Sequence, residues 1–208
     1  AFQSSSGATA CDACEAGGWC GPGASATTLC DAGKHRNSTG GALEADCVDC
    51  GAGYACAKGA VDRTACEAGS VSLDGVECVG CVAGKYQPSA AQSACVACPA
   101  GSYCLERTVT PLHCSPGGFA DEPGLSACFE CVAGEFQSSS SATACDACEA
   151  GGWCGPGASA ATPCDARTFN GTTSARSQAD CADCPAGSAC PTGTSVPVAC
   201  EPGSAAAA

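Results

Sequence analysis

Cysteine is the residue type with the most chemical potential in this sequence, with 24 cysteines among 208 residues. That share exceeds the roughly 8 to 10% that is typical of a disulfide scaffold, and the even number suits pairing. Seven pairs have the spacing Cys-x-x-Cys, which can also hold zinc or carry out thiol redox chemistry. Zinc would leave the intervening cysteines without a role, and the redox motif lacks its βαβ context. The spacing therefore favours disulfides.

The cysteines follow two spacings, one short and one long, which predict a local pairing scheme. The short spacing is the same in every short frame, and the long spacing is at least twice as great. The short-frame pairs are Cys14/Cys20, Cys50/Cys56, Cys98/Cys104, Cys148/Cys154 and Cys184/Cys190. The long-frame pairs are Cys30/Cys47, Cys66/Cys78, Cys81/Cys95, Cys114/Cys128, Cys131/Cys145 and Cys164/Cys181. Cys11 and Cys200 remain, and each is expected to pair outside the segment. Spacing alone leaves open an interleaved scheme, such as Cys98 with Cys114 and Cys104 with Cys128.

Other residues offer little material for catalysis. His35 and His113 are the only histidines, and His35 occupies a position that is aromatic in most frames, which favours packing over acid/base chemistry. The sequence contains no Gly-x-Ser-x-Gly motif, no phosphate-binding loop and no recognisable pair of carboxylates. We therefore expect no catalytic, cofactor-binding or metal-binding residues, no cofactor, and a chain that is not an enzyme.

Two sequons predict N-linked glycans. They are Asn37-Ser38-Thr39 and Asn170-Gly171-Thr172, and they lie in the long loops 30–47 and 164–181. These loops are longer than those of the other long frames, so Asn37 and Asn170 are expected to project outward. Both sequons fit a protein of the secretory pathway that is located outside the cell or at its surface.

Composition and charge exclude several classes of partner. The net charge is −13 with eight Lys and Arg, so no basic stripe is available for nucleic acid or anionic lipid. No apolar run approaches the roughly 18 residues of a membrane span, so this segment is not expected to insert into a membrane. Leu, Ile, Val and Phe number only 22, too few for a large hydrophobic core. Cross-links are therefore expected to offset the chain entropy.

One short frame repeats along the whole chain. Its pattern is Cys-x-(Ala/Pro)-Gly, with an aromatic residue five positions after the cysteine in most copies. Glycine permits the positive φ of a tight turn, and the aromatic ring can cover the disulfide and pack against the ring of a neighbouring frame. The frames begin at Cys14, Cys30, Cys50, Cys66, Cys81, Cys98, Cys114, Cys131, Cys148, Cys164, Cys184 and Cys200. Arg167 replaces the glycine in one frame.

A longer repeat lies on top of the frames. With Phe2 aligned on Phe136, the segments 2–32 and 136–166 match at 28 of 31 positions. This divides the chain into a first block copy at 1–66, linking repeats at 67–131 and a partial second copy at 132–200. Residues 201–208 would begin a further repeat. Ala205 stands where most frames carry their aromatic, which suggests that Ala205 to Ala208 represent unassigned side chains.

The expected fold is a series of small disulfide-rich repeats. Gly and Pro punctuate almost every frame, and no window sustains a helical apolar period. We expect turns and short β ribbons, little helix and no large hydrophobic core. Stacked frames would form an elongated rod.

The segments Cys95–Cys104 and Cys131–Phe136 resemble the ephrin-receptor-like cysteine-rich repeats and, more loosely, tumour-necrosis-factor-receptor modules. Such repeats are similar across animal receptors and the large surface and flagellar-hair proteins of protists and algae. The resemblance implies an extracellular rod and defines no ligand-binding residue. The near-identity of the segments 2–32 and 136–166 favours a building block of a filament, sheath or appendage, with copies of itself or other extracellular structural proteins as partners, because a filament reuses one contact surface. The alternative is the stalk or ligand-binding region of a receptor or adhesin.

Overall fold

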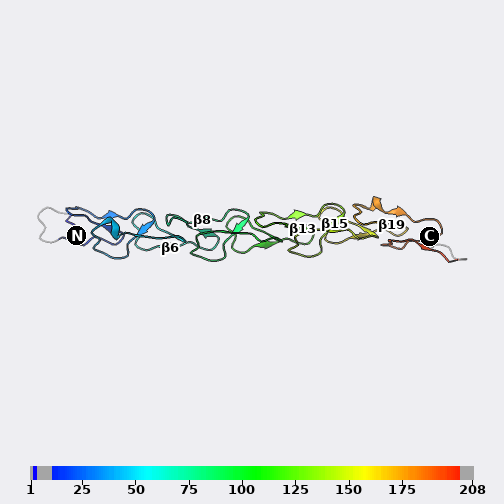
Figure 1. Cartoon of the computed structure of the whole chain (residues 1–208), viewed down its shortest axis with the longest axis horizontal. Helices are drawn as coiled ribbons and strands as arrows, with labels where there is room; N and C mark the ends of the chain where they lie inside the picture. Colours follow the sequence, from blue (N-terminus) through cyan, green and yellow to red (C-terminus); the bar gives the residue numbers. More distant parts are fainter. Residues whose placement is uncertain (1, 4–10, 202–208) are drawn as a thin grey trace. The chain divides into compact units, whose positions relative to one another are not determined.

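Two compact units make up the chain in the computed structural model, which describes residues 2–3 and 11–201. The first unit comprises Ala1–Ala97 with Leu105–Thr110, and the second comprises Cys98–Cys104 with Pro111–Ala208. The expectation for Ala205 to Ala208 lies outside the described residues. Within each unit the elements follow one another in chain order, as the colours of Figure 1 show.

Every strand is two residues long and belongs to a two-stranded antiparallel ribbon. In the first unit the ribbons pair β1 (Gly18–Trp19) with β2 (Thr28–Leu29), β3 (Lys34–His35) with β4 (Val48–Asp49), β5 (Tyr54–Ala55) with β6 (Thr64–Ala65), β7 (Ser70–Val71) with β8 (Val79–Gly80), and β9 (Lys85–Tyr86) with β10 (Val96–Ala97). In the second unit they pair β11 (Ser102–Tyr103) with β12 (Leu112–His113), β13 (Gly118–Phe119) with β14 (Phe129–Glu130), β15 (Glu135–Phe136) with β16 (Asp146–Ala147), β17 (Gly152–Trp153) with β18 (Thr162–Pro163), β19 (Thr168–Phe169) with β20 (Ala182–Asp183), and β21 (Ser188–Ala189) with β22 (Val198–Ala199).

The ribbon of each frame follows directly from its sequence. The glycine after the cysteine has a positive φ, for example +78° at Gly101, which reverses the chain. The two residues after it then pair with the two residues that precede the next frame, as Tyr103 pairs with Leu112. The N–H of the next cysteine, Cys114, donates to the carbonyl of Gly101 at 3.1 Å. Each frame is therefore closed by its own backbone.

Two short 3-10 turns occupy equivalent positions in the long loops. They are η1 (Glu44–Asp46) and η2 (Gln178–Asp180), and each is followed directly by the second cysteine of a long frame. The carboxylate of Asp46 accepts the backbone N–H groups of Ala42 at 2.7 Å and Leu43 at 3.0 Å. The turn is therefore closed by one side chain that satisfies two donors.

Cysteines fill the interior of the described residues. The largest side chains with less than 2% exposure are all cysteines, whereas leucines and valines such as Leu73 and Val132 are mostly exposed. The fold is thus the predicted series of small disulfide-rich ribbon repeats. The aromatic residues of the frames are half-buried. Phe119 packs against Phe129 of its own ribbon, with ring centroids 5.7 Å apart, and the Arg63 guanidinium lies 3.9 Å from the centre of the Tyr54 ring. Both contacts lie within a single frame, whereas the sequence predicted packing between the rings of neighbouring frames.

Candidate functional site

Eleven disulfides close the frames in the described residues. The short-frame bridges join Cys14–Cys20, Cys50–Cys56, Cys98–Cys104, Cys148–Cys154 and Cys184–Cys190. The long-frame bridges join Cys30–Cys47, Cys66–Cys78, Cys81–Cys95, Cys114–Cys128, Cys131–Cys145 and Cys164–Cys181. These are the pairs of the local scheme, and the interleaved scheme does not occur. Cys11 and Cys200 are free; Cys11 is exposed and Cys200 is half-buried.

In the described residues, nine turns are also bound by the frame that follows them. At 2.7–2.9 Å, the N–H of the turn residue donates to a backbone carbonyl about one frame further along the chain. These bonds join Gly17 to Arg36, Gly33 to Cys56, Gly53 to Ser72, Gly69 to Gln87, Gly101 to Ala120, Gly117 to Gln137, Gly134 to Cys154, Gly151 to Asn170, and Arg167 to Cys190.

A second contact reaches two frames further along the chain. The carbonyl of one residue in that frame covers the turn glycine so closely that a Cβ on the glycine would collide with it. The covered and covering residues are Gly17 and Gly59, Gly53 and Ala91, Gly69 and Arg107, Gly101 and Ser141, Gly117 and Gly157, Gly134 and Ser174, and Gly151 and Gly193. The turn glycine is therefore required twice, for its positive φ and for this close approach.

All of the covering residues have a left-handed backbone conformation, and each also makes a backbone hydrogen bond to the frame in between. Their N–H groups donate at 2.8–2.9 Å to the first cysteine of the intermediate frame, as Gly157 donates to Cys131. Ala91, Arg107, Ser141 and Ser174 have φ between 57° and 63°, a conformation that costs a non-glycine residue on the order of 1 kcal/mol. One covering residue thus ties three consecutive frames together. Sequence reasoning missed these residues, because they share a backbone conformation and no residue type.

A buried polar side chain anchors several covering loops. It follows the aromatic of its frame, as Gln137 follows Phe136. The Gln137 side chain donates to the Ala144 carbonyl at 2.9 Å and accepts the Ser139 N–H at 2.9 Å, and Gln87 makes the same bonds to Ala94 and Ser89. Both glutamines are at most 9% exposed. The anchor side chain therefore fixes the backbone conformation of the loop that carries the covering residue.

Asn170 takes this anchor position, so the prediction that it projects outward is wrong. Its side chain is 4% exposed, donates to the Gly152 carbonyl at 3.0 Å, and accepts both the N–H and the hydroxyl of Thr172. The sequon is therefore used as an internal hydrogen-bonding unit of the loop. Asn37, by contrast, is exposed in the equivalent loop, where Arg36 occupies the anchor position.

His35 lies beside a disulfide in the first unit. Its Nδ1 is 3.4 Å from Cys50 Sγ, and the ligand atoms of His35, Cys50 and Cys56 lie within 4.8 Å of one another. The spacing resembles that of a metal site, but both sulfurs are bonded to each other. In this state the imidazole fills the place that an aromatic ring fills in most other frames.

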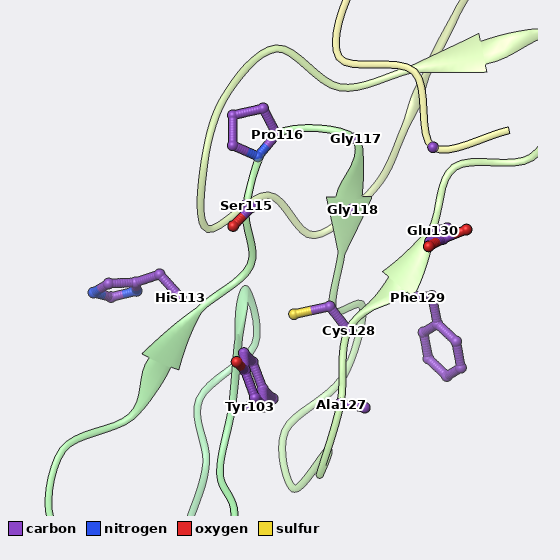
Figure 2. A pocket seen from close by; sticks show the side chains of 11 residues that line it. Tyr103, His113, Ser115, Pro116, Gly117, Gly118, Ala127, Cys128, Phe129 and Glu130 are labelled. Carbon is purple, nitrogen blue, oxygen red and sulfur yellow. The ribbon is translucent and has the colours of Figure 1, made fainter. Parts of the chain in front are cut away.

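His113 and Ser102 meet across another ribbon. His113 Nδ1 is 3.2 Å from Ser102 Oγ, which is a distance that general-base activation of a hydroxyl requires. Ser102, however, is only 2% exposed. Beside this pair lies a pocket of about 430 Å³ around Gly117; Figure 2 shows that the side chains of His113 and Phe129 extend to opposite sides of it. The hydrogen bond therefore serves to join the two strands.

Another pocket, of about 740 Å³, surrounds the last disulfide turn of the described residues. Its lining includes Cys184, Pro185, Gly187 and Pro191, together with Arg167. Gly187 has the positive φ of the other turns, but no described atom lies within 4 Å of the position that its Cβ would take. No described residue therefore covers this turn, whereas seven earlier turns are covered.

The two 3-10 turns carry the groups with shifted pKa values. The backbone N–H groups of Leu43 and Ala42 hold the pKa of Asp46 below its ordinary value of 3.8, and the positive charge of Arg36 adds to this effect. The N–H groups of Arg176 and Ser177 do the same for the pKa of Asp180. Both carboxylates are therefore stabilised in their charged, hydrogen-bond-accepting form.

These features define an extracellular-type, disulfide-stabilised module built of overlapping small repeats. Residues 69–110 match the family model described as tyrosine-protein kinase ephrin type A/B receptor-like. The chain thus contains a cysteine-rich repeat of the ephrin-receptor-like kind, and frames outside the matched residues have the same ribbons and bridges. No curated protein matches the chain. Among the described residues, no helix has the length and apolar character needed to cross a membrane.

Proposed function

We propose that this chain is a structural building block of an extracellular filament, sheath or cell-surface or flagellar appendage. The observation that carries the proposal is the repeated covering contact, in which seven turns of the described residues each accept a loop from two frames further along the chain. A contact that depends on backbone geometry can be repeated without limit, which is how repeat proteins extend. The near-identity of the segments 2–32 and 136–166 is consistent with reuse of one contact surface.

In this role the protein acts outside the cell and reaches its site through the secretory pathway. Its partners are copies of itself or other extracellular structural proteins, with N-linked glycan carried at Asn37. The disulfides keep a chain with few large apolar residues folded, and the protein gives mechanical support without catalytic turnover. Two observations favour this role. The interior is filled by disulfide-bonded cysteines, which is typical of proteins in an oxidising compartment, and Ser102 is too buried to serve as a nucleophile.

A second candidate is the stalk or ligand-binding region of a receptor or adhesin. The match of residues 69–110 to a receptor-derived family model favours it. Imaging of the native source with an antibody against this chain separates the two candidates. Labelling at regular intervals along a filament or sheath supports the structural role, whereas isolated labelled stalks at the plasma membrane support the receptor role and contradict the first proposal.

A further inference from the structure

His35 distinguishes one short-frame disulfide from its counterparts. In four ribbons, the residue at the aromatic position pairs with the residue that lies two positions before the first cysteine of a short frame. These pairs are His35 with Val48, Tyr86 with Val96, Phe136 with Asp146, and Phe169 with Ala182, and the cysteines that follow are Cys50, Cys98, Cys148 and Cys184. Of the four rings, only the imidazole has a nitrogen that can bind a metal ion.

The imidazole and the two sulfurs lie close enough together to bind one metal ion. His35 Nδ1 is 3.4 Å from Cys50 Sγ, and the ligand atoms of His35, Cys50 and Cys56 all lie within 4.8 Å of one another. A sulfur and a nitrogen that bind the same tetrahedral zinc ion lie about 3.5 Å apart. Among the described residues, no other group of three or more His, Cys, Asp or Glu side chains comes so close. Only the disulfide bond itself keeps the sulfurs from acting as ligands.

The backbone holds these residues in place by bonds other than the disulfide. The Cys50 N–H donates to the Gly33 carbonyl at 2.9 Å, and the Gly33 N–H donates to the Cys56 carbonyl at 2.9 Å. The Cys56 N–H in turn donates to the Gly75 carbonyl at 2.9 Å. Because the bridge closes a loop of only six positions, its loss costs less loop-closure entropy than the loss of a long-frame bridge. The reduced frame therefore keeps its ligands close together.

The spacing of the two cysteines also leaves room for an ion. Their Cα atoms are 6.3 Å apart, the widest separation among the eleven bridges. After reduction, rotation about the Cα–Cβ bonds can bring the sulfurs to the separation of about 3.8 Å that two thiolate ligands of one zinc ion adopt. No movement of the backbone is needed.

The donor set favours zinc. Thiolate and imidazole are the ligands of protein zinc sites, whereas Ca²⁺ and Mg²⁺ take oxygen ligands. Cys50 and Cys56 are at most 1% exposed, so competing ligands cannot easily reach the sulfurs. His35 is half-buried, which leaves one side of the group near solvent. A water molecule can complete the four ligands from that side.

We propose that the frame closed by Cys50 and Cys56 has a second state, in which both thiolates and His35 Nδ1 bind one Zn²⁺ ion. Every disulfide forms from two thiols, so the ligands of this state exist during oxidative folding. The sequence prediction of no metal-binding residue considered only the Cys-x-x-Cys pairs, whereas these two cysteines are six positions apart. The site forms within neighbouring frames of one chain and is independent of the proposed structural role.

The two states interconvert by balanced reactions. When zinc binds, the thiols of Cys50 and Cys56 each release a proton, and the neutral His35 ring contributes the lone pair of Nδ1. Oxidised glutathione then forms the bond between the two Sγ atoms, its own disulfide bond breaks, and Zn²⁺ is released. Two electrons pass from the cysteine thiolates to glutathione, whose two sulfurs take up two protons from water. Bound zinc therefore opposes closure of this bridge.

The test refolds the full chain with and without Zn²⁺. A Cys11→Ser/Cys200→Ser background removes the two described cysteines that are free. The reduced chain is oxidised in a mixture of reduced and oxidised glutathione, and native mass spectrometry counts the bridges and the bound zinc. With Zn²⁺ we expect one bound ion and one bridge fewer than without it. Alkylation after removal of the metal should locate the two thiols at Cys50 and Cys56.

His35→Phe and Phe169→His are matched variants. Phe169 is the equivalent of His35 in the second block copy, and its ribbon leads to the Cys184–Cys190 bridge. His35→Phe should weaken zinc binding more than about a hundredfold, since loss of an outer-shell partner alone costs 10- to 100-fold. Formation of all the bridges without zinc checks that this variant folds. Phe169→His should bind a second zinc ion at Cys184 and Cys190.

Co²⁺ in place of Zn²⁺ reports the ligand types. We expect thiolate-to-cobalt charge-transfer bands and the visible bands of a four-coordinate ion in the parent chain, and neither in His35→Phe. Bands of equal strength in His35→Phe would assign the metal to thiolates alone and overturn the proposal. So would zinc located at other cysteines of the parent chain, or complete bridge formation without bound zinc. A single zinc ion in Phe169→His would contradict the role given to the imidazole.

Discussion

The long loops 30–47 and 164–181 have the same backbone features but different side chains at the buried anchor position. Both are closed by a disulfide with a sequence separation of 17, and both contain a 3-10 turn with an aspartate at its end. In the second loop, the Asn170 side chain donates one hydrogen bond to Gly152 and accepts two from Thr172. In the first, the Arg36 guanidinium binds the carbonyls of Asp46 and Thr39, while its Nε is buried without a partner among the described residues.

Neighbouring positions differ in the same direction. Trp153 donates its ring N–H to Gln178 at 3.1 Å, and Gln178 in turn donates to Thr168. The equivalents of the last two residues in the first loop are Glu44 and Lys34, which carry charges. The comparison teaches that cysteine, glycine and aspartate set the backbone, whereas the side chains between them are free to diverge. The anchor position itself holds a neutral Asn170 in one loop and a charged Arg36 in the other.

The two sequons should differ completely in glycan occupancy. We expect a glycan at Asn37, which is exposed, and none at Asn170, whose amide nitrogen is buried against the Gly152 carbonyl. Enzymatic release of glycans in heavy-oxygen water, followed by peptide mass mapping of the native protein, measures occupancy at each site. Full occupancy at Asn170 would show that the anchor does not form in the mature protein.

Removal of either long-loop bridge should cost the same free energy. Replacing both cysteines of Cys30–Cys47 or of Cys164–Cys181 by serine should lower local stability by about 3 kcal/mol, because the two bridges close loops of equal length. Hydrogen exchange of the amides in β4 and β20 measures the effect in each loop. A large difference between the two variants would mean that loop closure alone does not account for the stabilisation.

Replacement of the anchors should separate the two loops. Asn170→Ala should destabilise its loop by about 1 to 3 kcal/mol, since the Gly152 carbonyl loses its buried donor. Arg36→Ala should cost about 1 kcal/mol or less, because the loss of its bonds to the Asp46 and Thr39 carbonyls is offset by removal of an Nε that is buried without a partner among the described residues. Hydrogen exchange of residues 38–47 and 172–181 gives both values. Arg36→Asn is the control, and a loss of stability in that variant would argue against a shared anchor position.

Acid should have the smallest effect, and both loops should respond in the same direction. Hydrogen bonding lowers the folded-state pKa of Asp46 and Asp180 below 3.8. Each carboxylate therefore stabilises its turn above the unfolded pKa, and this contribution is lost as the pH falls through the folded pKa. Amide exchange in η1 and η2 during an acid titration measures the loss. In Asp46→Asn the dependence should disappear from η1 and persist in η2; persistence in both would assign it to other groups.

Part of this architecture was predictable and part was not. The frames, their ribbons and the cysteine-filled interior follow from patterns within a single frame, where the glycine and the two cysteines lie close along the chain. The prediction for Asn170 was wrong because a sequon describes a local sequence, whereas burial depends on the ribbon β17–β18 that receives the side chain. The sequence predicted stacking between the rings of neighbouring frames, but Phe119 contacts Phe129 and Tyr54 contacts Arg63, each within its own frame.

The sequence by itself determined that the chain is a series of disulfide-closed turns, because each closure joins residues that are close along the chain. Only the tertiary structure decided which residues cover the turns. Ala91, Arg107, Ser141 and Ser174 share no residue type, and their left-handed conformations are unfavourable in isolation. A hydrogen bond to one earlier frame and a close contact with another offset that cost, so the conformation arises from contacts that no local pattern encodes.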